Sequence, residues 1–113
     1  MKMPLRLFTI LVFGLTFLPL PSPAAEETLL MTTIKNQRFV PDEIHAKEGQ
    51  SFVLRVINED TVPVEFESSD LNKEKMVQPG KSIDLPFKGL KAGTYEFFSD
   101  FGPKELKGKI VVN

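Results

Sequence analysis

The sequence LKAGTYEFFSD (residues 90–100) contains a turn followed by a strand. Leu90, Gly93 and Tyr95 have the Leu-x-x-Gly-x-Tyr spacing of a tyrosine corner, in which the phenol hydroxyl bonds back to the connecting backbone. The alternative is a buried tyrosine that merely follows a turn. In a strand over residues 93–98, successive side chains point to opposite faces of the sheet, so every second side chain from Tyr95 should face a core. Because tyrosine corners occur in Greek-key sandwiches, this stretch favours a Greek-key β-sandwich.

Segments of strand composition lie on both sides of this corner, at residues 28–35, 43–47, 51–58, 64–68, 82–87 and 108–112. Residues 39–42 are expected to be irregular. Residues 69–76 are polar and predict a helical turn, capped by Ser69 or Asp70. Short strands at near-regular spacing predict an all-β fold, a Greek-key β-sandwich or barrel of about seven strands.

The first 25 residues have the features of a cleavable signal peptide. Lys2 and Arg6 precede an apolar run that ends among prolines, and small residues follow, with cleavage expected after Ala24 or Ala25. The alternative is an uncleaved anchor, but the run is short for a membrane span, which usually needs about 20 apolar residues. We therefore expect export to the periplasm and one domain over residues 26–113.

Composition excludes several classes of function. Loss of the leader leaves 12 of the 14 basic residues against all 15 acidic ones, a net charge near −3, and no basic patch suggests nucleic-acid binding. The chain has no cysteine, so disulfides, thiolate nucleophiles and thiolate metal ligands are absent. No Ser-His-Asp set, phosphate-binding glycine loop or acid–base pair appears, so the sequence offers no support for hydrolysis or phosphoryl transfer.

Several motifs resemble the cupredoxins over residues 28–113. They are a Phe-x-Pro-x-x-Ile segment from Phe39, a turn at residues 48–50 and a following strand that ends at Asn58. More specific motifs resemble the small periplasmic cupredoxin-like proteins associated with bacterial iron permeases: Glu65-Phe66-Glu67-Ser68, Asp70-Leu71-Asn72-x-Glu74-Lys75, Gly93-x-Tyr95-x-Phe97-Phe98 and Asp100-Phe101. The resemblance implies a cupredoxin fold and a membrane iron permease, or another periplasmic uptake component, as partner.

The resemblance also implies where a type 1 copper site would lie. Blue-copper cupredoxins bind copper through two His, one Cys and a weak axial Met. In this chain the corresponding positions hold Val64, Ser99, Gly102 and Leu106. None supplies a thiolate, imidazole or thioether, and Gly102 departs from the His usual in the iron-associated group, so no type 1 copper is expected.

Carboxylates remain as candidate metal ligands. Glu65, Glu67, Glu74 and Asp100 lie in the segments that resemble the iron-associated proteins, and oxygen ligands suit iron. Alternation places Glu65 and Glu67 on one strand face, and Asp100 leaves the 93–98 strand outward. The alternative is ordinary surface charge. The single histidine, His45, should be a solvated side chain on a remote strand.

A thioether and two aromatic side chains are further candidates for a functional role. Met76 could be a soft ligand for cuprous copper, although it and Met31 could equally fill gaps in the core. Phe98 and Phe101 lie where cupredoxins dock partners, and either could anchor an interface, the alternative being that Phe101 folds over the barrel end.

These observations lead to one function hypothesis with two rivals. The first is a periplasmic cupredoxin-like accessory protein of metal uptake, with iron as the favoured metal. Its candidate metal ligands are Glu65, Glu67, Asp100, Glu74 and Met76. The rivals are a metal-free interaction module of the envelope and a non-blue copper-binding protein or ferroxidase subunit. The copper-binding rival would use His45, Met76 and carboxylates and assist ferrous iron oxidation. No membrane insertion is expected after signal cleavage.

Overall fold

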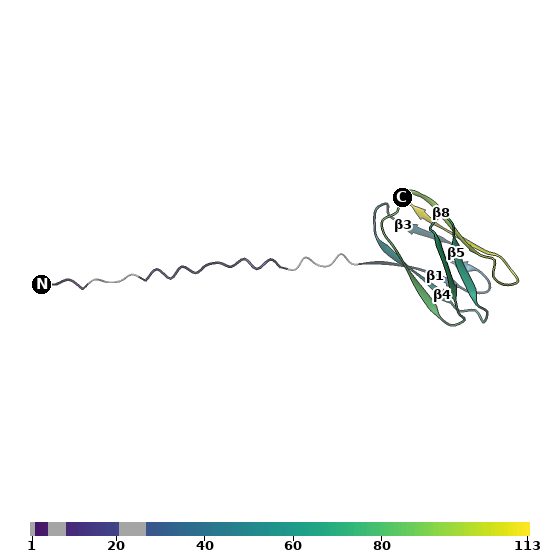
Figure 1. The fold of residues 1–113 in the computed structure, drawn as a ribbon, viewed down its shortest axis with the longest axis horizontal. Helices are drawn as coiled ribbons and strands as arrows, with labels where there is room; N and C mark the ends of the chain where they lie inside the picture. The colour runs from purple at the N-terminus through teal and green to yellow at the C-terminus, as the bar shows by residue number, and fades with distance from the viewer. Residues whose placement is uncertain (1, 5–8, 21–26) are drawn as a thin grey trace.

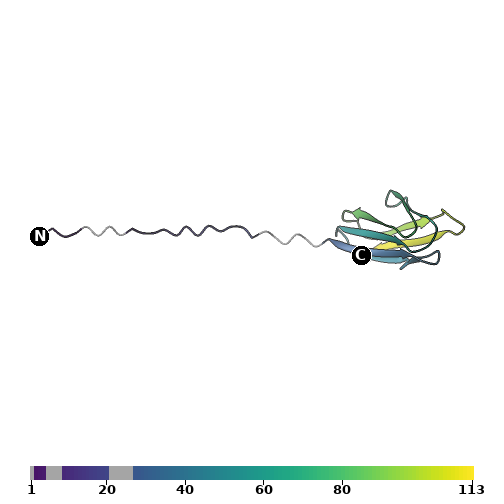
Figure 2. The ribbon, with the colours of Figure 1, turned by 90° about the horizontal axis from the view of Figure 1, so that it is seen from below.

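The computed structural model describes residues 2–4, 9–20 and 27–113. Residues 9–20 contain no helix or strand and lie outside the folded domain (Figure 1, Figure 2). The expected cleavage site after Ala24 or Ala25 lies outside the described residues. Within the described parts of the chain, no helix has the length and apolar character needed to cross a bilayer.

The domain is a sandwich of two mixed sheets. The strands of the described chain are β1 (Thr28–Ile34), β2 (Phe39–Val40), β3 (Glu43–Ala46), β4 (Phe52–Asn58), β5 (Val64–Ser68), β6 (Lys73–Val77), β7 (Ser82–Phe87), β8 (Gly93–Ser99) and β9 (Leu106–Val112). One sheet has the order β2-β1-β4-β7 and the other β3-β9-β8-β5-β6. The pairs β1·β4 and β3·β9 are parallel, and the others are antiparallel. The all-β sandwich predicted from the sequence is confirmed.

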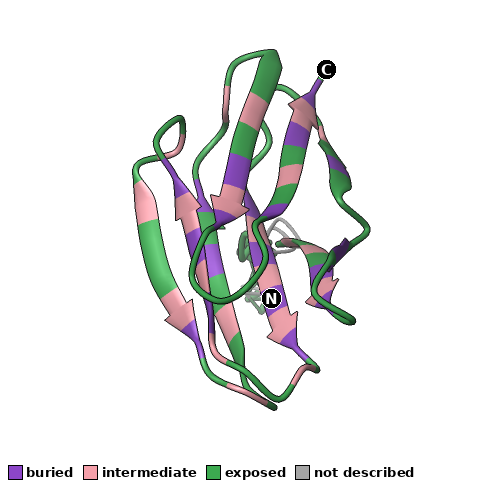
Figure 3. Cartoon of the chain, turned by 90° about the vertical axis from the view of Figure 1, so that its right-hand side faces the viewer, coloured by how far each residue is buried: buried purple, intermediate pink, exposed green. Residues whose placement is uncertain are grey.

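Side chains alternate between the core and the outside along most strands (Figure 3). In β4, Phe52, Leu54 and Val56 are buried, and the residues between them are half-buried on the outer face. This is the period-two pattern expected when one face of each sheet packs against the other. The inward positions are therefore specified by packing, and the outward positions are free to carry chemistry.

Three phenylalanines form the centre of the core. The Phe97 ring stacks on Phe66 and meets Phe39 edge-on, with both ring centroids 4.9 Å away. Gly108 lies opposite Phe97 in the register of β8 and β9, and a Cβ atom there would lie 2.4 Å from the Phe97 ring. Gly108 therefore leaves the space that this ring occupies.

The tyrosine corner is confirmed. The Tyr95 hydroxyl donates a hydrogen bond of 2.8 Å to the carbonyl oxygen of Lys91, in the connection before β8. Tyr95 also packs against the core cluster. The corner fixes the start of β8, the strand that leads to the candidate site.

The helical turn predicted at residues 69–76 is wrong. Only a turn at Ser69–Asn72 interrupts the sheet, closed by a hydrogen bond from the Asn72 N–H to the Ser69 carbonyl, and β6 follows it. Asp70 caps no helix, because its carboxylate accepts the Glu96 N–H of β8 at 2.9 Å. Asn72 has a φ of 52°, a left-handed conformation that ends any helical path and starts the return strand.

Two smaller expectations also change. Residues 39–42 are not wholly irregular, because Phe39 and Val40 form β2 against the end of β1. The last strand begins at Leu106, two residues before the predicted start at Gly108, because Leu106 pairs with Ser99.

Candidate metal site

The β5–β6 hairpin holds three of the predicted acidic residues. Val64, Phe66 and Ser68 are buried, so the intervening Glu65 and Glu67 lie half-buried on the outer face of the five-stranded sheet. In the hairpin register Glu67 is opposite Glu74, and Glu65 is opposite Met76. Since directly paired residues of an antiparallel sheet point to the same face, Glu74 and Met76 share this face with the two glutamates.

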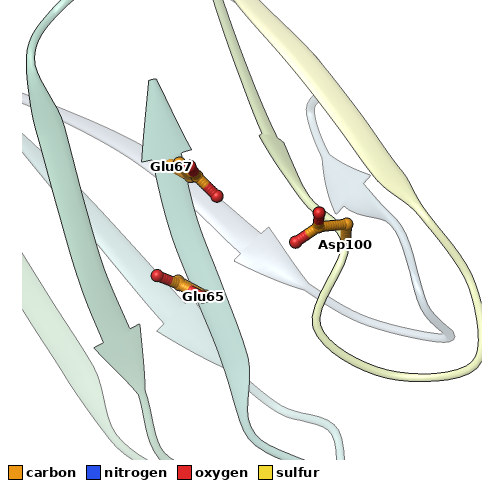
Figure 4. A group of neighbouring side chains, drawn as sticks. All are labelled: Glu65, Glu67 and Asp100. Atoms are coloured by element: carbon orange, nitrogen blue, oxygen red, sulfur yellow. The ribbon is translucent and has the colours of Figure 1, made fainter. Parts of the chain in front are cut away.

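Asp100 reaches the same place from the end of β8. Ser99, the last residue of β8, is buried, and its hydroxyl oxygen accepts the Glu65 N–H at 3.2 Å. This bond ties the end of β8 to the start of β5. The exposed Asp100 side chain consequently lies beside the glutamates (Figure 4).

The three carboxylates form a group whose size suits a cation. One oxygen atom each from Glu65, Glu67 and Asp100 lie within 4.8 Å of one another. Two of the side chains are half-buried and one is exposed, so the group is open to solvent. The structure thus brings together the three residues selected from the sequence, and their binding of a metal stays a prediction.

The electrostatics of the cluster are dominated by like charge. The pKa of Glu65 is raised above its ordinary value, first by a hydrogen bond with Glu74, then by partial burial and by the charges of Glu74, Glu67 and Asp100. Among the described residues, no Lys, Arg or His nitrogen lies within 4.0 Å of these four carboxylates. Either a shared proton or a cation would therefore relieve the repulsion.

Lysines on the same sheet face are paired elsewhere. Lys107 lies 3.8 Å from Glu105, and Lys109 lies 3.7 Å from Glu43. Both lysines are on β9, one strand beyond β8. They lie on the other side of β8 from the two β5 glutamates, which leaves the negative charge of the cluster uncompensated.

His45 is not part of the site. It is an exposed residue of β3, and β9 and β8 separate β3 from β5 in the sheet. Its Nε2 lies 3.8 Å from a Glu43 carboxylate oxygen. The prediction of a surface histidine remote from the metal end is confirmed.

Aromatic side chains adjoin the cluster. Phe98 is half-buried and pairs with Glu67 on one side and Lys107 on the other. It also lines a groove of about 550 Å³ over β3, β8 and β9. Phe101 is 47% exposed, so it does not fold into the core. Both side chains are accessible, and their use in docking stays a prediction.

Comparison with known proteins identifies relatives of the chain. The cupredoxin-like domain family matches residues 7–112. An uncharacterized protein of Rickettsia prowazekii (strain Madrid E) is 41% identical over 81 residues, which cover 72% of this chain and 65% of that protein. The chain thus spans about two thirds of that relative's length.

Solved structures share the fold. A mutant of amicyanin in its reduced state is 26% identical with a TM-score of 0.61, and the match covers 84% of this chain and 95% of the amicyanin chain. Auracyanin A, a "blue" copper protein of Chloroflexus aurantiacus, is 16% identical with a TM-score of 0.64, over 77% of this chain and 99% of auracyanin.

The residues at the expected copper positions do not fit type 1 copper. Val64, Ser99 and Leu106 are buried, and Ser99 pairs directly with Leu106 across β8 and β9. The chain has no cysteine, and the Ser99 hydroxyl is engaged with the Glu65 backbone. Gly102 offers no side-chain donor. At this end of the sandwich, packing and a backbone hydrogen bond occupy the positions where a blue-copper protein has ligands.

Proposed function

Because the chain belongs to the cupredoxin-like family yet lacks the type 1 copper ligands, we propose that it is an accessory protein of metal uptake. Its cargo is iron, held transiently by Glu65, Glu67 and Asp100, with Glu74 at the edge of the site. The amino-terminal features of a signal peptide support a location in the periplasm.

The cluster of carboxylates within 4.8 Å of one another supports this proposal. Carboxylate oxygens are hard donors, which suit ferrous and ferric iron better than cuprous copper. Three open carboxylates completed by water make a weak site from which a metal can leave. Such weakness suits a protein that passes its cargo to another protein, and not one that retains a resident cofactor.

The partner in this proposal is a membrane iron permease or another periplasmic uptake component. The motifs around Glu65 and Asp100 resemble those of proteins found with such permeases. Phe98 and Phe101 border the cluster and supply the apolar anchors that a docking surface needs. Docking through them would bring the cargo next to its acceptor.

Anaerobic calorimetric titration with Fe²⁺ tests the site. Glu65→Gln/Glu67→Gln keeps side-chain shape and removes two ligand charges, so the affinity should fall at least about 10-fold. The matched control Glu43→Gln/Glu96→Gln removes two charges from the same sheet face outside the cluster and should change the affinity less than about twofold. Equal affinities for the wild type and the cluster variant would remove these glutamates from the mechanism and favour the metal-free interaction module.

A non-blue copper site is the competing candidate, and the register supports it in one respect. Met76 is half-buried, opposite Glu65, and offers a thioether on the same face. A cuprous site would lose affinity in Met76→Leu, whereas the iron site would not. The same variant would impair ferrous iron oxidation if the chain acted as a ferroxidase subunit with copper. In either case, added copper should give no intense visible charge-transfer band, because no thiolate is present.

A further inference from the structure

The outer face of the four-stranded sheet is apolar, unlike that of the other sheet. Strand register brings its outward side chains into three rows that run across β1, β4 and β7, with β2 at one corner. Six of the ten outward residues on these strands are apolar: Leu29, Met31, Val40, Val53, Ile57 and Pro86. We call this surface the β4 face.

Large apolar side chains are unusually exposed there. From residue 27 onward, five large hydrophobic residues of the described chain are classed as exposed, and two of these, Val62 and Phe101, lie in loops. The other three are Leu29, Met31 and Val40, which are 47%, 51% and 52% exposed and all belong to the β4 face. A contiguous exposed apolar surface of this kind commonly marks an interaction site.

One ion pair occupies the middle of the face. The central row is Met31, Arg55 and Asp84, in register across β1, β4 and β7. The Arg55 guanidinium donates two hydrogen bonds to the Asp84 carboxylate, from Nε at 2.8 Å and from Nη2 at 3.0 Å. The outward positions of the four strands hold no other charged residue, so the four strands contribute no net charge to the face, although the charge of Lys75, on β6, also reaches Asp84 at the β7 edge.

We propose that the β4 face is the contact surface between two copies of this chain, related by a two-fold axis. The domain as a whole is acidic, so two copies repel through most of their surface. They meet without that repulsion at a neutral apolar face. An axis that lies in the interface, parallel to the strands and between β1 and β4, lays β1 of each copy over β4 of the other, so that Leu29 faces Val53 and Met31 faces Arg55 across the interface.

The size of the face sets the strength of this dimer. β1, β4 and β7 are six or seven residues long and spaced by about 4.8 Å, and together with the two-residue β2 they present roughly 350 Å² per copy. The total of roughly 700 Å² is below the range of about 1,200–2,000 Å² for stable complexes. The dimer is therefore weak and forms between about 10 μM and 1 mM protein.

Sedimentation equilibrium of residues 27–113, which contain all the described strands and core residues, tests the dimer. The wild type should pass from monomer to dimer over that concentration range. Leu29→Glu places a carboxylate among the apolar side chains of the row that holds Val53, where the folded monomer leaves it in solvent, and should weaken association at least about 10-fold. Phe101→Ser is the matched control for an equally exposed apolar residue off the face, and should have no effect.

Charge exchange across the interface gives a second test. Arg55→Asp leaves two acidic groups at the centre of the face, and Asp84→Arg leaves two basic groups, so neither variant should dimerise alone. An equimolar mixture of the two should form a heterodimer, which also shows that both variants are folded. A wild type that stays monomeric at about 1 mM overturns the proposal. The proposal is also overturned if Phe101→Ser weakens the dimer and Leu29→Glu does not, or if the mixture of the two charge variants does not associate.

Discussion

The two outer faces of this sandwich differ in charge although one core supports both. The face of the five-stranded sheet carries Glu65, Glu67 and Glu74 side by side with Asp100 at its end. The β4 face carries one internally satisfied ion pair among apolar side chains. Inward positions of both sheets are mainly apolar, and each sheet also buries two polar residues: Thr32 and Asn58 in one, Ser68 and Ser99 in the other.

This difference shows which positions carry function in the domain. Core packing restricts the inward side chains, whereas the outward ones are restricted mainly by solubility. Four neighbouring carboxylates and an exposed apolar surface both depart from an evenly mixed polar surface. The two proposals place cation binding on one face and self-association on the other, and variants of each face can test whether the two are independent.

The largest effect is expected from a charge reversal within the cluster. Glu67→Lys changes the local charge by two units about 5 Å from a bound cation, and Fe²⁺ affinity should fall about 10- to 30-fold at moderate salt. The lysine also relieves repulsion among the remaining carboxylates, so thermal stability should not fall. Titration and thermal unfolding measure the two quantities.

The same variant tests the separation of the faces. The monomer–dimer equilibrium of Glu67→Lys should match that of the wild type, because the β4 face lies on the other side of the core. A change in association as large as the change in metal affinity would mean that the two faces do not act independently.

A core variant should affect stability more than either surface function. In Gly108→Ala the new Cβ would lie 2.4 Å from the Phe97 ring and 3.0 Å from the Asp42 carbonyl oxygen. Overpacking of this kind costs about 1–3 kcal/mol, which urea unfolding measures. Metal affinity and dimerisation of the folded fraction should stay within about twofold of the wild type. The matched control is Gly80→Ala, where a Cβ meets nothing within 4 Å, although a φ of 71° adds local backbone strain.

Period-two alternation explains why most of the fold could be predicted from the sequence. In β4 and β8 apolar residues hold alternate, inward positions, namely Phe52, Leu54 and Val56 in β4 and Tyr95 and Phe97 in β8, and this period of two is typical of a half-buried strand. β6 was missed because Lys73-Glu74-Lys75-Met76-Val77 lacks aromatic residues and has only one β-branched residue. It forms a strand because β5 pairs with it and because Val77 is buried, and these interactions are tertiary.

Register explains which parts of the sites could be predicted. Glu65 and Glu67 are two residues apart on one strand, so their common face follows from the sequence alone. The position of Glu74 opposite Glu67 depends on the length of the turn before β6, which was mistaken for a helical turn. The β4 face was missed because it depends on the parallel pairing of β1 with β4, a long-range contact that local sequence does not specify.

The smallest predicted effects are the pH dependences of two carboxylates, one on each face. The pKa of Glu65 is raised above its ordinary value near 4.5, chiefly by the hydrogen bond with Glu74. Glu65 therefore contributes to the free energy of unfolding below pH 4.5, and this contribution is lost as the pH rises through the folded-state pKa. The pKa of Asp84 is lowered from its ordinary value near 3.8, chiefly by the hydrogen bond from Arg55. Asp84 contributes to the free energy of unfolding above pH 3.8, and this contribution is lost as the pH falls through the folded-state pKa.

At pH 7, Glu65→Gln should therefore raise the melting temperature and Asp84→Asn should lower it, each by about 1–2 °C because both groups are solvated. The Glu65 difference should shrink as the pH falls through the raised pKa of Glu65, and the Asp84 difference should persist to lower pH because the pKa of Asp84 lies below its ordinary value. Dilute protein keeps the measurement on the monomer, and shifts of the same sign in the two variants would contradict the opposite electrostatic character of the two faces.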